Sequence, residues 1–337
     1  MAPRVSVLLP CFNHGAFIGE AIQSVLAQTE QDFEIVIVDD GSTDPATITT
    51  LDRLPAPGIV LLRTENRGLP AARNHAARHA SGEFFCALDA DDRLASSWFA
   101  KATALLDGQP HVAFVSHWLE TFGDEHWTWT PERCDLAALL ARNTVNGAAL
   151  VRRTAFEAVG GYDEAMRGGC EDWDLWLRLV QRGFSGAIVP EVLFYYRRRA
   201  DSMSRLMLDP GAYRAPLEAL ITRHRAAYRD HLVDVLVAKE AEALHLTREI
   251  GDLEADRLTV LEPMLERAGE EHAALSAKAG RAAAARGREE ERSHLAWKAA
   301  ELEREVTELR ASWSWRITAP LRGLYARTWG TRGRDRS

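Results

Sequence analysis

Several signals that would assign this chain of 337 residues to a familiar class are missing. Its four cysteines form no C-x-x-C pair and lack zinc-ligand spacing, which favours reduced thiols over a disulfide framework or a structural zinc site. No run of 18 or more residues is apolar, so we expect no membrane span. The first residues show no signal-peptide pattern, and we expect a cytoplasmic protein.

Charge and nucleotide motifs exclude further classes. A net charge of −8 gives no sign of a nucleic-acid partner. The chain has no P-loop and no G-x-G-x-x-G after a predicted strand, which disfavours ATP and dinucleotide sites. With 46% hydrophobic and 27% charged residues, it has the composition of a globular protein, and its length suggests about two domains.

Short apolar runs alternate with helical patterns over the first 92 residues. The runs cover residues 5–9, 33–38, 59–62 and 84–88. Helical spacing separates the first two, where Ile18, Ala21, Ile22 and Val25 recur. This alternation predicts an α/β fold with a mostly parallel central sheet and helices on both of its faces.

A polar cluster follows each of the four predicted strands. The clusters are Pro10-Cys11-Phe12-Asn13, Asp39-Asp40-Gly41-Ser42, Asn66-Arg67-Gly68 and Asp89-Ala90-Asp91-Asp92. Any one of them is compatible with an ordinary turn. All four fall at the carboxyl ends of the strands, where open α/β sheets bind ligands, so they predict one shared site. The D-x-D spacing of the last cluster suits a hard divalent ion carried by phosphates.

The middle of the chain predicts a mixed α/β region. Strand signals occur at residues 112–116, 127–129 and 189–196, and helical signals at 135–141, 154–159 and 172–181. Glu171 and Asp172 open the last of these helices. Acidic residues favour helix N-termini, so capping and catalysis both remain open for this pair.

The last third of the chain predicts long helices followed by a basic tail. A near-heptad seam is formed by Leu236, Ala243, Leu246, Ile250, Leu253, Val260 and Met264. Such a seam needs a partner helix, so we expect a homo-oligomer formed through a coiled coil, with Pro263 kinking or interrupting the helix. From Arg310 to Ser337 there are seven arginines, several tryptophans and one acidic residue. This composition favours peripheral contact with an anionic membrane, with docking on a protein surface as the alternative.

The four strand-end clusters, together with Ala72-Arg73-Asn74, resemble the motifs of the inverting glycosyltransferases of family 2, which have the GT-A fold. The resemblance implies a nucleoside-diphosphate sugar donor, a hexose or related sugar, a carbohydrate or lipid-linked acceptor, and Mg²⁺ or Mn²⁺. The string from Ser312 to Arg322 also resembles one found at the C-terminal ends of bacterial polysaccharide glycosyltransferases.

The resemblance also implies residue roles. Pro10 and Phe12 would line the base pocket, and Asp39 would accept a hydrogen bond from the base. Arg73 would lie near the nucleotide, Asp89 near the ribose and metal, and Asp91 would bind the metal. The remaining nucleotide-binding or substrate-binding candidates are Asn13, Asp40, Gly68 and Glu171. Asp172 would be the general base, with Glu171 contacting the acceptor or the loop backbone.

The sequence departs from the family pattern near the end of the last predicted strand. Many relatives carry a histidine shortly after a Tyr-Arg pair, and here Arg199 stands about there. Arginine does not ligate a cation but pairs with phosphate, so a third protein ligand for the metal is in doubt. Arg199 is therefore a candidate for phosphate binding, with an ordinary basic surface as the alternative.

We thus expect a transferase domain over residues 1–205, divided at residue 92 into a nucleotide-binding half and an acceptor half. A helical segment would follow over 206–311 and a basic aromatic tail over 312–337. The expected setting is surface polysaccharide or glycolipid synthesis at the inner face of the cell membrane. Two rivals remain: a nucleotide-cleaving enzyme, and a non-catalytic coiled-coil interaction protein with a degenerate transferase-like domain.

Overall fold

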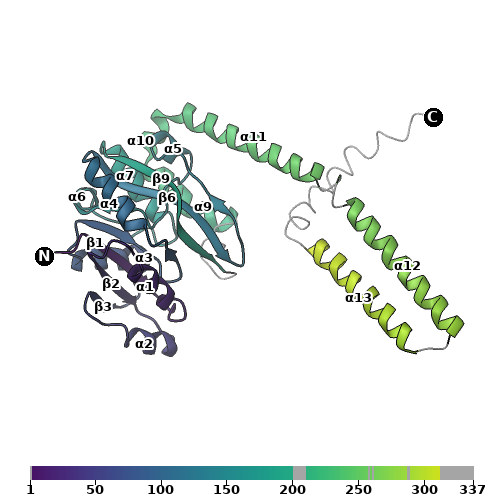
Figure 1. Ribbon diagram of the computed structural model, residues 1–337. Coiled ribbons are helices and arrows are strands. Elements are labelled where there is room, and N and C mark those ends of the chain that lie inside the picture. The colour runs from purple at the N-terminus through teal and green to yellow at the C-terminus, as the bar shows by residue number, and fades with distance from the viewer. Residues whose placement is uncertain (1, 200–209, 257–258, 260–261, 287–288, 312–337) are drawn as a thin grey trace. The chain divides into compact units, whose positions relative to one another are not determined.

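The computed structural model describes residues 2–199, 210–256, 259, 262–286 and 289–311 (Figure 1). Contacts divide the chain into two compact units, residues 1–239 and residues 240–337. Within the described ranges, no helix combines the length and the apolar character needed to cross a membrane.

One mixed sheet forms the framework of the first unit. Its strands are β1 (Val5–Cys11), β2 (Phe33–Asp40), β3 (Ile59–Thr64), β4 (Phe84–Ala87), β5 (Arg93–Leu94), β6 (Val112–Gly123), β7 (Thr128–Trp129), β8 (Leu150–Arg152) and β9 (Ser185–Arg198). They lie in the order β3-β2-β1-β4-β8-β6-β9-β5, and β7 pairs with β6. Strands β1 to β4 are mutually parallel, whereas β8 runs antiparallel to both β4 and β6. The predicted α/β class is confirmed.

Helices cover both faces of this sheet. They are α1 (Ile18–Leu26), α2 (Pro45–Leu51), α3 (Leu69–His79), α4 (Trp98–Gly108), α5 (Leu136–Ala141), α6 (Arg153–Ala158), α7 (Glu171–Gln181), α9 (Pro210–Arg223) and α10 (Arg225–Asp230). Alternate strand residues face opposite sides. Val7 of β1 therefore joins a core with α1 and α4, while its neighbour Leu8 joins the core with α3, α5 and α7.

Helix α9 packs into the second of these cores. Its Leu220 is fully buried in the same cluster as Trp176 of α7, and Tyr228 of α10 packs against that cluster. The compact unit therefore extends beyond residue 205, where the sequence analysis ended the transferase domain.

Long helices make up the rest of the described chain. Helix α11 (Leu232–Asp256) is followed by α12 (Glu262–Arg286) and α13 (Glu289–Ala311), and the last two lie beside each other. Pro263 is the second residue of α12, in the first turn, where proline is tolerated. Leu236 and Leu253 of the predicted seam are more than half exposed. The coiled coil stays a prediction, and the basic tail lies outside the described residues.

Candidate active site

The carboxyl ends of β1, β2, β3 and β4 lie along one edge of the sheet, as their parallel pairing requires. Cys11 of β1 pairs with Asp39 of β2, which in turn pairs with Arg63 of β3. The four predicted polar clusters therefore leave the sheet on the same side. Pro10 is buried in β1, whereas Phe12, just beyond the strand, is 42% exposed.

Asn13 connects the first two clusters. Its backbone is left-handed, with φ of 59°, and its Oδ1 accepts hydrogen bonds from the backbone N–H groups of Thr43 at 2.8 Å and Asp44 at 2.9 Å. Asp39, which is 4% exposed, accepts a bond from the N–H of Ser42 at 2.9 Å. These contacts fix the shape of the loops around the predicted base pocket.

Asp40 connects the second cluster to the third. It accepts hydrogen bonds from the backbone N–H groups of Arg67 at 2.9 Å and Gly68 at 2.8 Å. The loop depends on glycine at position 41, because φ there is +76° and an added Cβ would lie 2.7 Å from the backbone nitrogen of Asn66. Asp40 thus supports the start of α3 through backbone contacts.

Arg73 links the two halves of the domain. Its Nη2 donates to Oδ1 of Asp89 at 2.7 Å, and its Nη1 donates to Oε1 of Glu171 at 2.7 Å. The side chain is 3% exposed and lies over the ring of Tyr162, 5.4 Å from its centre. Asp89 follows β4, whereas Glu171 begins α7. The buried guanidinium of Arg73 therefore connects the strand edge that carries the polar clusters to the helix that carries the predicted base.

The acidic cluster after β4 is held by residues at the end of β9. Asp92 is buried and accepts a hydrogen bond from the backbone N–H of Arg197 at 2.7 Å. The side chain of Asp91 is 14% exposed and lies 3.2 Å from Nη1 of Arg199. Burial, with repulsion from Asp89, raises the pKa of Asp91; burial and both neighbouring aspartates raise the pKa of Asp92 further. Of the two predicted metal ligands, Asp91 therefore faces Arg199, just beyond the end of β9, whereas Asp89 faces Arg73.

The predicted base, Asp172, lies in the first turn of α7. Its Oδ2 accepts a hydrogen bond from Nδ2 of Asn143 at 3.2 Å. Burial raises the pKa of Asp172, the charge of Arg73 lowers it, and that of Asp89 raises it. Asp172 therefore shares one electrostatic environment with Arg73 and Asp89. Its neighbour Glu171 is 7% exposed, and burial raises the pKa of this group to about 7.

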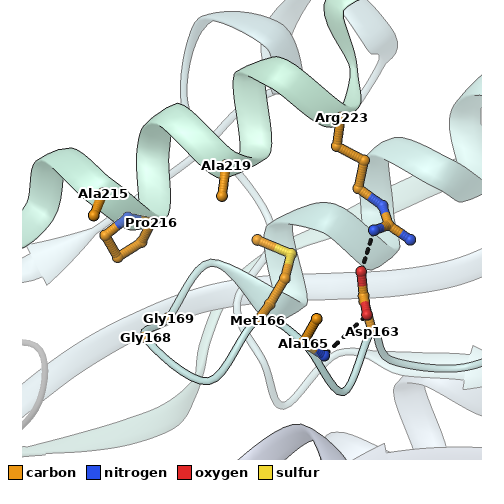
Figure 2. A pocket seen from close by; sticks show the side chains of 9 residues that line it. All are labelled: Asp163, Ala165, Met166, Gly168, Gly169, Ala215, Pro216, Ala219 and Arg223. Atoms are coloured by element: carbon orange, nitrogen blue, oxygen red, sulfur yellow. Dashed lines mark hydrogen bonds and ion pairs between the residues drawn. The ribbon is translucent and has the colours of Figure 1, made fainter.

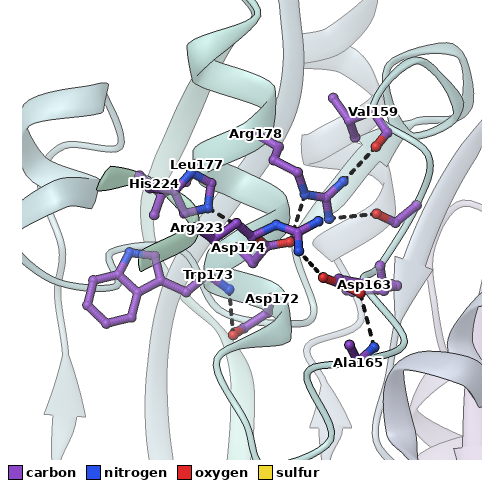
Figure 3. A network of polar contacts seen from close by, with 12 residues as sticks. Val159, Asp163, Ala165, Asp172, Trp173, Asp174, Leu177, Arg178, Arg223 and His224 are labelled. Atoms are coloured by element: carbon purple, nitrogen blue, oxygen red, sulfur yellow. Dashed lines mark hydrogen bonds and ion pairs between the residues drawn. The ribbon is translucent and has the colours of Figure 1, made fainter. Parts of the chain in front are cut away.

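A buried ionic network fixes the other side of α7 (Figure 3). Asp174 is fully buried and accepts one hydrogen bond from Nε of Arg178 at 2.7 Å; His224 and Arg223 lie 2.9 Å from its other oxygen. Burial favours a higher pKa for Asp174, but the bond to His224 and the charge of Arg178 bring the pKa below its usual range. Arg223 also pairs with Asp163, so α9 is tied to α7 and to the loop before it.

A cavity of about 340 Å³ lies between that loop and α9 (Figure 2). Small and apolar side chains line most of it, and the Asp163–Arg223 pair closes one end. The lining residues are Asp163, Ala165, Met166, Gly168, Gly169, Ala215, Pro216, Ala219 and Arg223. Because Gly168 and Gly169 directly precede Cys170 and α7, the cavity borders the loop that leads to Asp172.

The structure therefore places Asp89 and Glu171 against the buried guanidinium of Arg73, with Asp172 next to Glu171 in the chain, and it places Asp91 beside Arg199. The sequence analysis assigned no site role to Asn143, Asp174 or His224. It also assigned no role to His14, whose Nε2 lies 3.2 Å from Nη2 of Arg199. One pattern in the sequence could have indicated Asp174. It lies four residues before Arg178 on the same helix, which is the spacing of an intrahelical ion pair.

Among the described residues, no group of three or more histidine, cysteine, aspartate or glutamate side chains is arranged to hold a metal ion. Asp89 and Asp91 are two carboxylates, and each is already paired with an arginine. Magnesium at a phosphate-bearing site needs one or two protein carboxylates, with phosphate oxygens and water as the other ligands. The carboxylate oxygens of Asp89 and Asp91 are therefore chemically suited to hold Mg²⁺ together with a diphosphate.

The fold and this strand-edge site define a nucleotide-sugar transferase of the GT-A class. Residues 6–167 match the family model described as Glycosyl transferase family 2, and residues 130–246 match that described as Glycosyltransferase like family 2. Together the two matches run through the whole sheet and α9. Residues 6–246 therefore form a family 2 glycosyltransferase domain.

Similar proteins agree with this assignment. EpsE of Bacillus subtilis (strain 168), named as a glycosyltransferase, is 29% identical over 216 residues, which cover 60% of this chain and 76% of EpsE. An uncharacterized glycosyltransferase of Haemophilus influenzae is 26% identical, with coverage of 57% and 67%. The crystal structure of S. aureus TarS 1-349 in complex with UDP-GlcNAc superimposes with a TM-score of 0.53 at 20% identity, over 60% of each chain. At this identity the last similarity concerns the fold.

Proposed function

We propose that this glycosyltransferase moves one sugar from a nucleoside-diphosphate sugar to a hydroxyl group of a carbohydrate or lipid-linked acceptor, with inversion at the anomeric carbon. The observation that carries the proposal is the placement of Arg73 between Asp89, at the end of β4, and Glu171, beside Asp172. This placement supports a single site that contains both the proposed donor-binding edge and the candidate base.

In this proposal Asp172 takes the proton of the acceptor hydroxyl. The acceptor oxygen then forms a bond to the anomeric carbon while the bond from that carbon to the diphosphate oxygen breaks and its electron pair leaves with the diphosphate. Burial raises the pKa of Asp172, which brings a carboxylate closer to the range in which it accepts a proton effectively near neutral pH. The bond from Asn143 orients the carboxylate.

Asp91 and Asp89 would hold Mg²⁺ or Mn²⁺ on the diphosphate. A bound ion of this kind stabilises the negative charge that develops on the leaving diphosphate. Within the chain itself, Arg73 supplies buried positive charge beside Asp89, and Arg199 supplies it beside Asp91. Asp39, Asp40 and the loops that they support would bind the nucleoside end.

The choice of the first donor to test comes from the TarS complex, which contains UDP-GlcNAc. The resemblance noted in the sequence supports surface polysaccharide or glycolipid synthesis on the cytoplasmic side of a membrane as the setting. The exposed apolar residues along α11, such as Leu236 and Val237, support self-association through the C-terminal helices. Sedimentation analysis of the full chain and of Leu236→Lys tests the self-association.

The transfer reaction is tested with a panel of UDP, GDP and dTDP sugars, with and without Mn²⁺. Thermal shift reports binding, and release of nucleoside diphosphate reports turnover. We expect Asp172→Asn to retain donor binding and to lose about 10²–10⁴-fold in turnover, which is the range for a positioned general base. Asp107→Asn, at an exposed ion pair with Arg4, is the matched control. Absence of both binding and turnover with every sugar would exclude the proposal.

A further inference from the structure

The acidic cluster after β4 forms a tight turn. The backbone N–H of Asp92 donates to the carbonyl oxygen of Asp89 at 3.1 Å, which closes a β-turn over residues 89–92. The two proposed metal ligands, Asp89 and Asp91, are the first and third residues of this turn. The hydrogen bond of the turn does not use the carbonyl oxygen of Asp91. The spacing of the two carboxylates therefore depends on what holds the backbone at Asp91.

Arg197, near the end of β9, bonds this turn at two points. Its backbone N–H donates to Oδ1 of Asp92 at 2.7 Å, and its side-chain Nε donates to the carbonyl oxygen of Asp91 at 2.8 Å. Nη2 of the same guanidinium donates to Oε2 of Glu20 in α1 at 2.8 Å. One residue of the sheet thus bonds both the peptide group that follows Asp91 and the side chain of Asp92.

The position of Arg197 is fixed by the sheet and by aromatic packing. Arg197 of β9 pairs with Phe122 of β6. Its side chain is 14% exposed, and its Cζ lies 4.4 Å from the centre of the Phe122 ring and 4.9 Å from that of the Phe17 ring. Because a planar guanidinium stacks on aromatic faces, these rings restrict the orientation from which Nε reaches the turn.

We propose that Arg197 is a positioning residue for the cation that carries the diphosphate. It does not touch the cation. It holds the backbone of the turn and thereby sets the spacing of the carboxylates of Asp89 and Asp91. The inference rests on the proposed function, which assigns the cation to these two residues. Arg197 acts on the backbone of Asp91, whereas Arg199 lies 3.2 Å from its carboxylate.

A turn held in one shape favours one kind of cation over another. Mg²⁺ requires near-octahedral geometry with ligands at about 2.0–2.1 Å, whereas Ca²⁺ accepts flexible arrangements with ligands at about 2.3–2.6 Å. Groups that orient metal ligands typically contribute about 10–100-fold to metal affinity. Loosening the turn should therefore weaken the binding of Mg²⁺ more than that of Ca²⁺.

The test measures Mn²⁺ binding to the full chain with saturating UDP, GDP or dTDP by electron paramagnetic resonance, followed by displacement of Mn²⁺ with Mg²⁺ or Ca²⁺. Samples without protein correct for the cation that the nucleotide binds by itself. For Arg197→Gln we expect the affinity for Mg²⁺ to fall about tenfold and that for Ca²⁺ by no more than about threefold. The ratio of the two affinities should therefore change at least about threefold.

Glu20→Gln is the matched control. It removes the charged partner of Nη2 and leaves the bond from Nε of Arg197 to Asp91 in place. Since Glu20 is 50% exposed, both cation affinities should stay within about twofold of the wild type. If Glu20→Gln changes the ratio as much as Arg197→Gln does, Arg197 acts as a tether to α1, and the positioning role is overturned.

The ratio separates positioning from general damage to the site. Equal losses for Mg²⁺ and Ca²⁺, a larger loss for Ca²⁺, or unchanged affinities in Arg197→Gln would overturn the inference. If this variant does not fold, Arg197→Lys decides: an ammonium group lacks the planar fork that bonds Asp91 and Glu20 at once, so the ratio should change about twofold in the same direction. An unchanged ratio would overturn the inference. A wild-type chain that binds no divalent cation with any of these nucleotides would refute the proposed function itself.

Discussion

Glu171 provides a pH-dependent test of the electrostatics around Arg73. Burial raises the pKa of this carboxyl group from 4.5 to about 7, and the charge of Arg73 opposes the rise. Because the pKa is higher in the folded protein than in the unfolded chain, the folded protein binds this proton more tightly. The stabilisation linked to protonated Glu171 is therefore complete below about pH 4.5 and is lost as the pH rises through about 7.

The size of the effect follows from the two pKa values. A rise from 4.5 to about 7 corresponds to about 3 kcal/mol at full development, since one pKa unit is worth about 1.4 kcal/mol. Most of this falls between pH 5 and pH 8. Glu171→Gln keeps the shape of the side chain and removes its titration. We expect the free energy of unfolding of the wild type, relative to the variant, to fall by about 2–3 kcal/mol over this range.

Urea unfolding at pH 5, 6, 7 and 8 measures this difference, followed by tryptophan fluorescence, to which Trp173 and Trp176 of α7 contribute. Glu157→Gln makes the same chemical change at an exposed ion pair with Arg153 and should run parallel to the wild type. If the unfolding free energies of Glu171→Gln and the wild type change in the same way across the four pH values, burial does not disfavour the charged form of Glu171, and the reasoning about this site is wrong.

Three further substitutions test the supports of the site. Asp40→Asn removes the negative charge that accepts hydrogen bonds from the backbone N–H groups of Arg67 and Gly68. The variant should lose about 1–2 kcal/mol of unfolding free energy in urea, and nucleotide should raise its melting temperature by less than that of the wild type. An unchanged thermal shift with nucleotide would contradict the role of the loop. Gly41→Ala places a Cβ 2.7 Å from a backbone nitrogen at positive φ, and should lower the melting temperature by several degrees; a melting temperature equal to that of the wild type would show that the loop relaxes freely. Asp174→Ala leaves Arg178, Arg223 and His224 without their buried carboxylate, and should cost about 3–5 kcal/mol in urea; a loss below about 1 kcal/mol would show that the network contributes little to stability.

The first half of the site could be predicted because each strand ends in a short, local pattern. An apolar run followed by Asp39-Asp40-Gly41 or Asp89-Ala90-Asp91 gives both the strand and its carboxyl end. Parallel pairing then places these ends on one edge without further information. The sheet confirms this part of the prediction, while the roles assigned to the individual side chains remain predictions.

Contacts between the two halves could not be predicted in the same way. Arg73 and Glu171 are separated by 98 positions, and their meeting depends on how α7 packs against the sheet. Strand β8 has three residues and β5 has two, too few to show a period, and β8 is the strand that reverses direction beside β4. The contact of His224 with Asp174 depends in turn on α9 packing against α7, beyond the end of the predicted domain.

The balance of charge at the strand edge explains why a cation belongs to the proposed reaction. Five carboxylates lie just after β4 and in the first turn of α7: Asp89, Asp91, Asp92, Glu171 and Asp172. The guanidinium groups of Arg73 and Arg199 pair with three of these carboxylates, Asp89, Glu171 and Asp91. Burial raises the pKa of Asp91, Asp92, Glu171 and Asp172, and repulsion from neighbouring carboxylates adds to the rise. A diphosphate that enters this edge adds further negative charge, so it is favoured when positive charge enters with it. Removing one carboxylate should therefore weaken the dependence of diphosphate binding on the cation, and nucleoside-diphosphate binding to Asp91→Asn with and without Mn²⁺ measures that dependence.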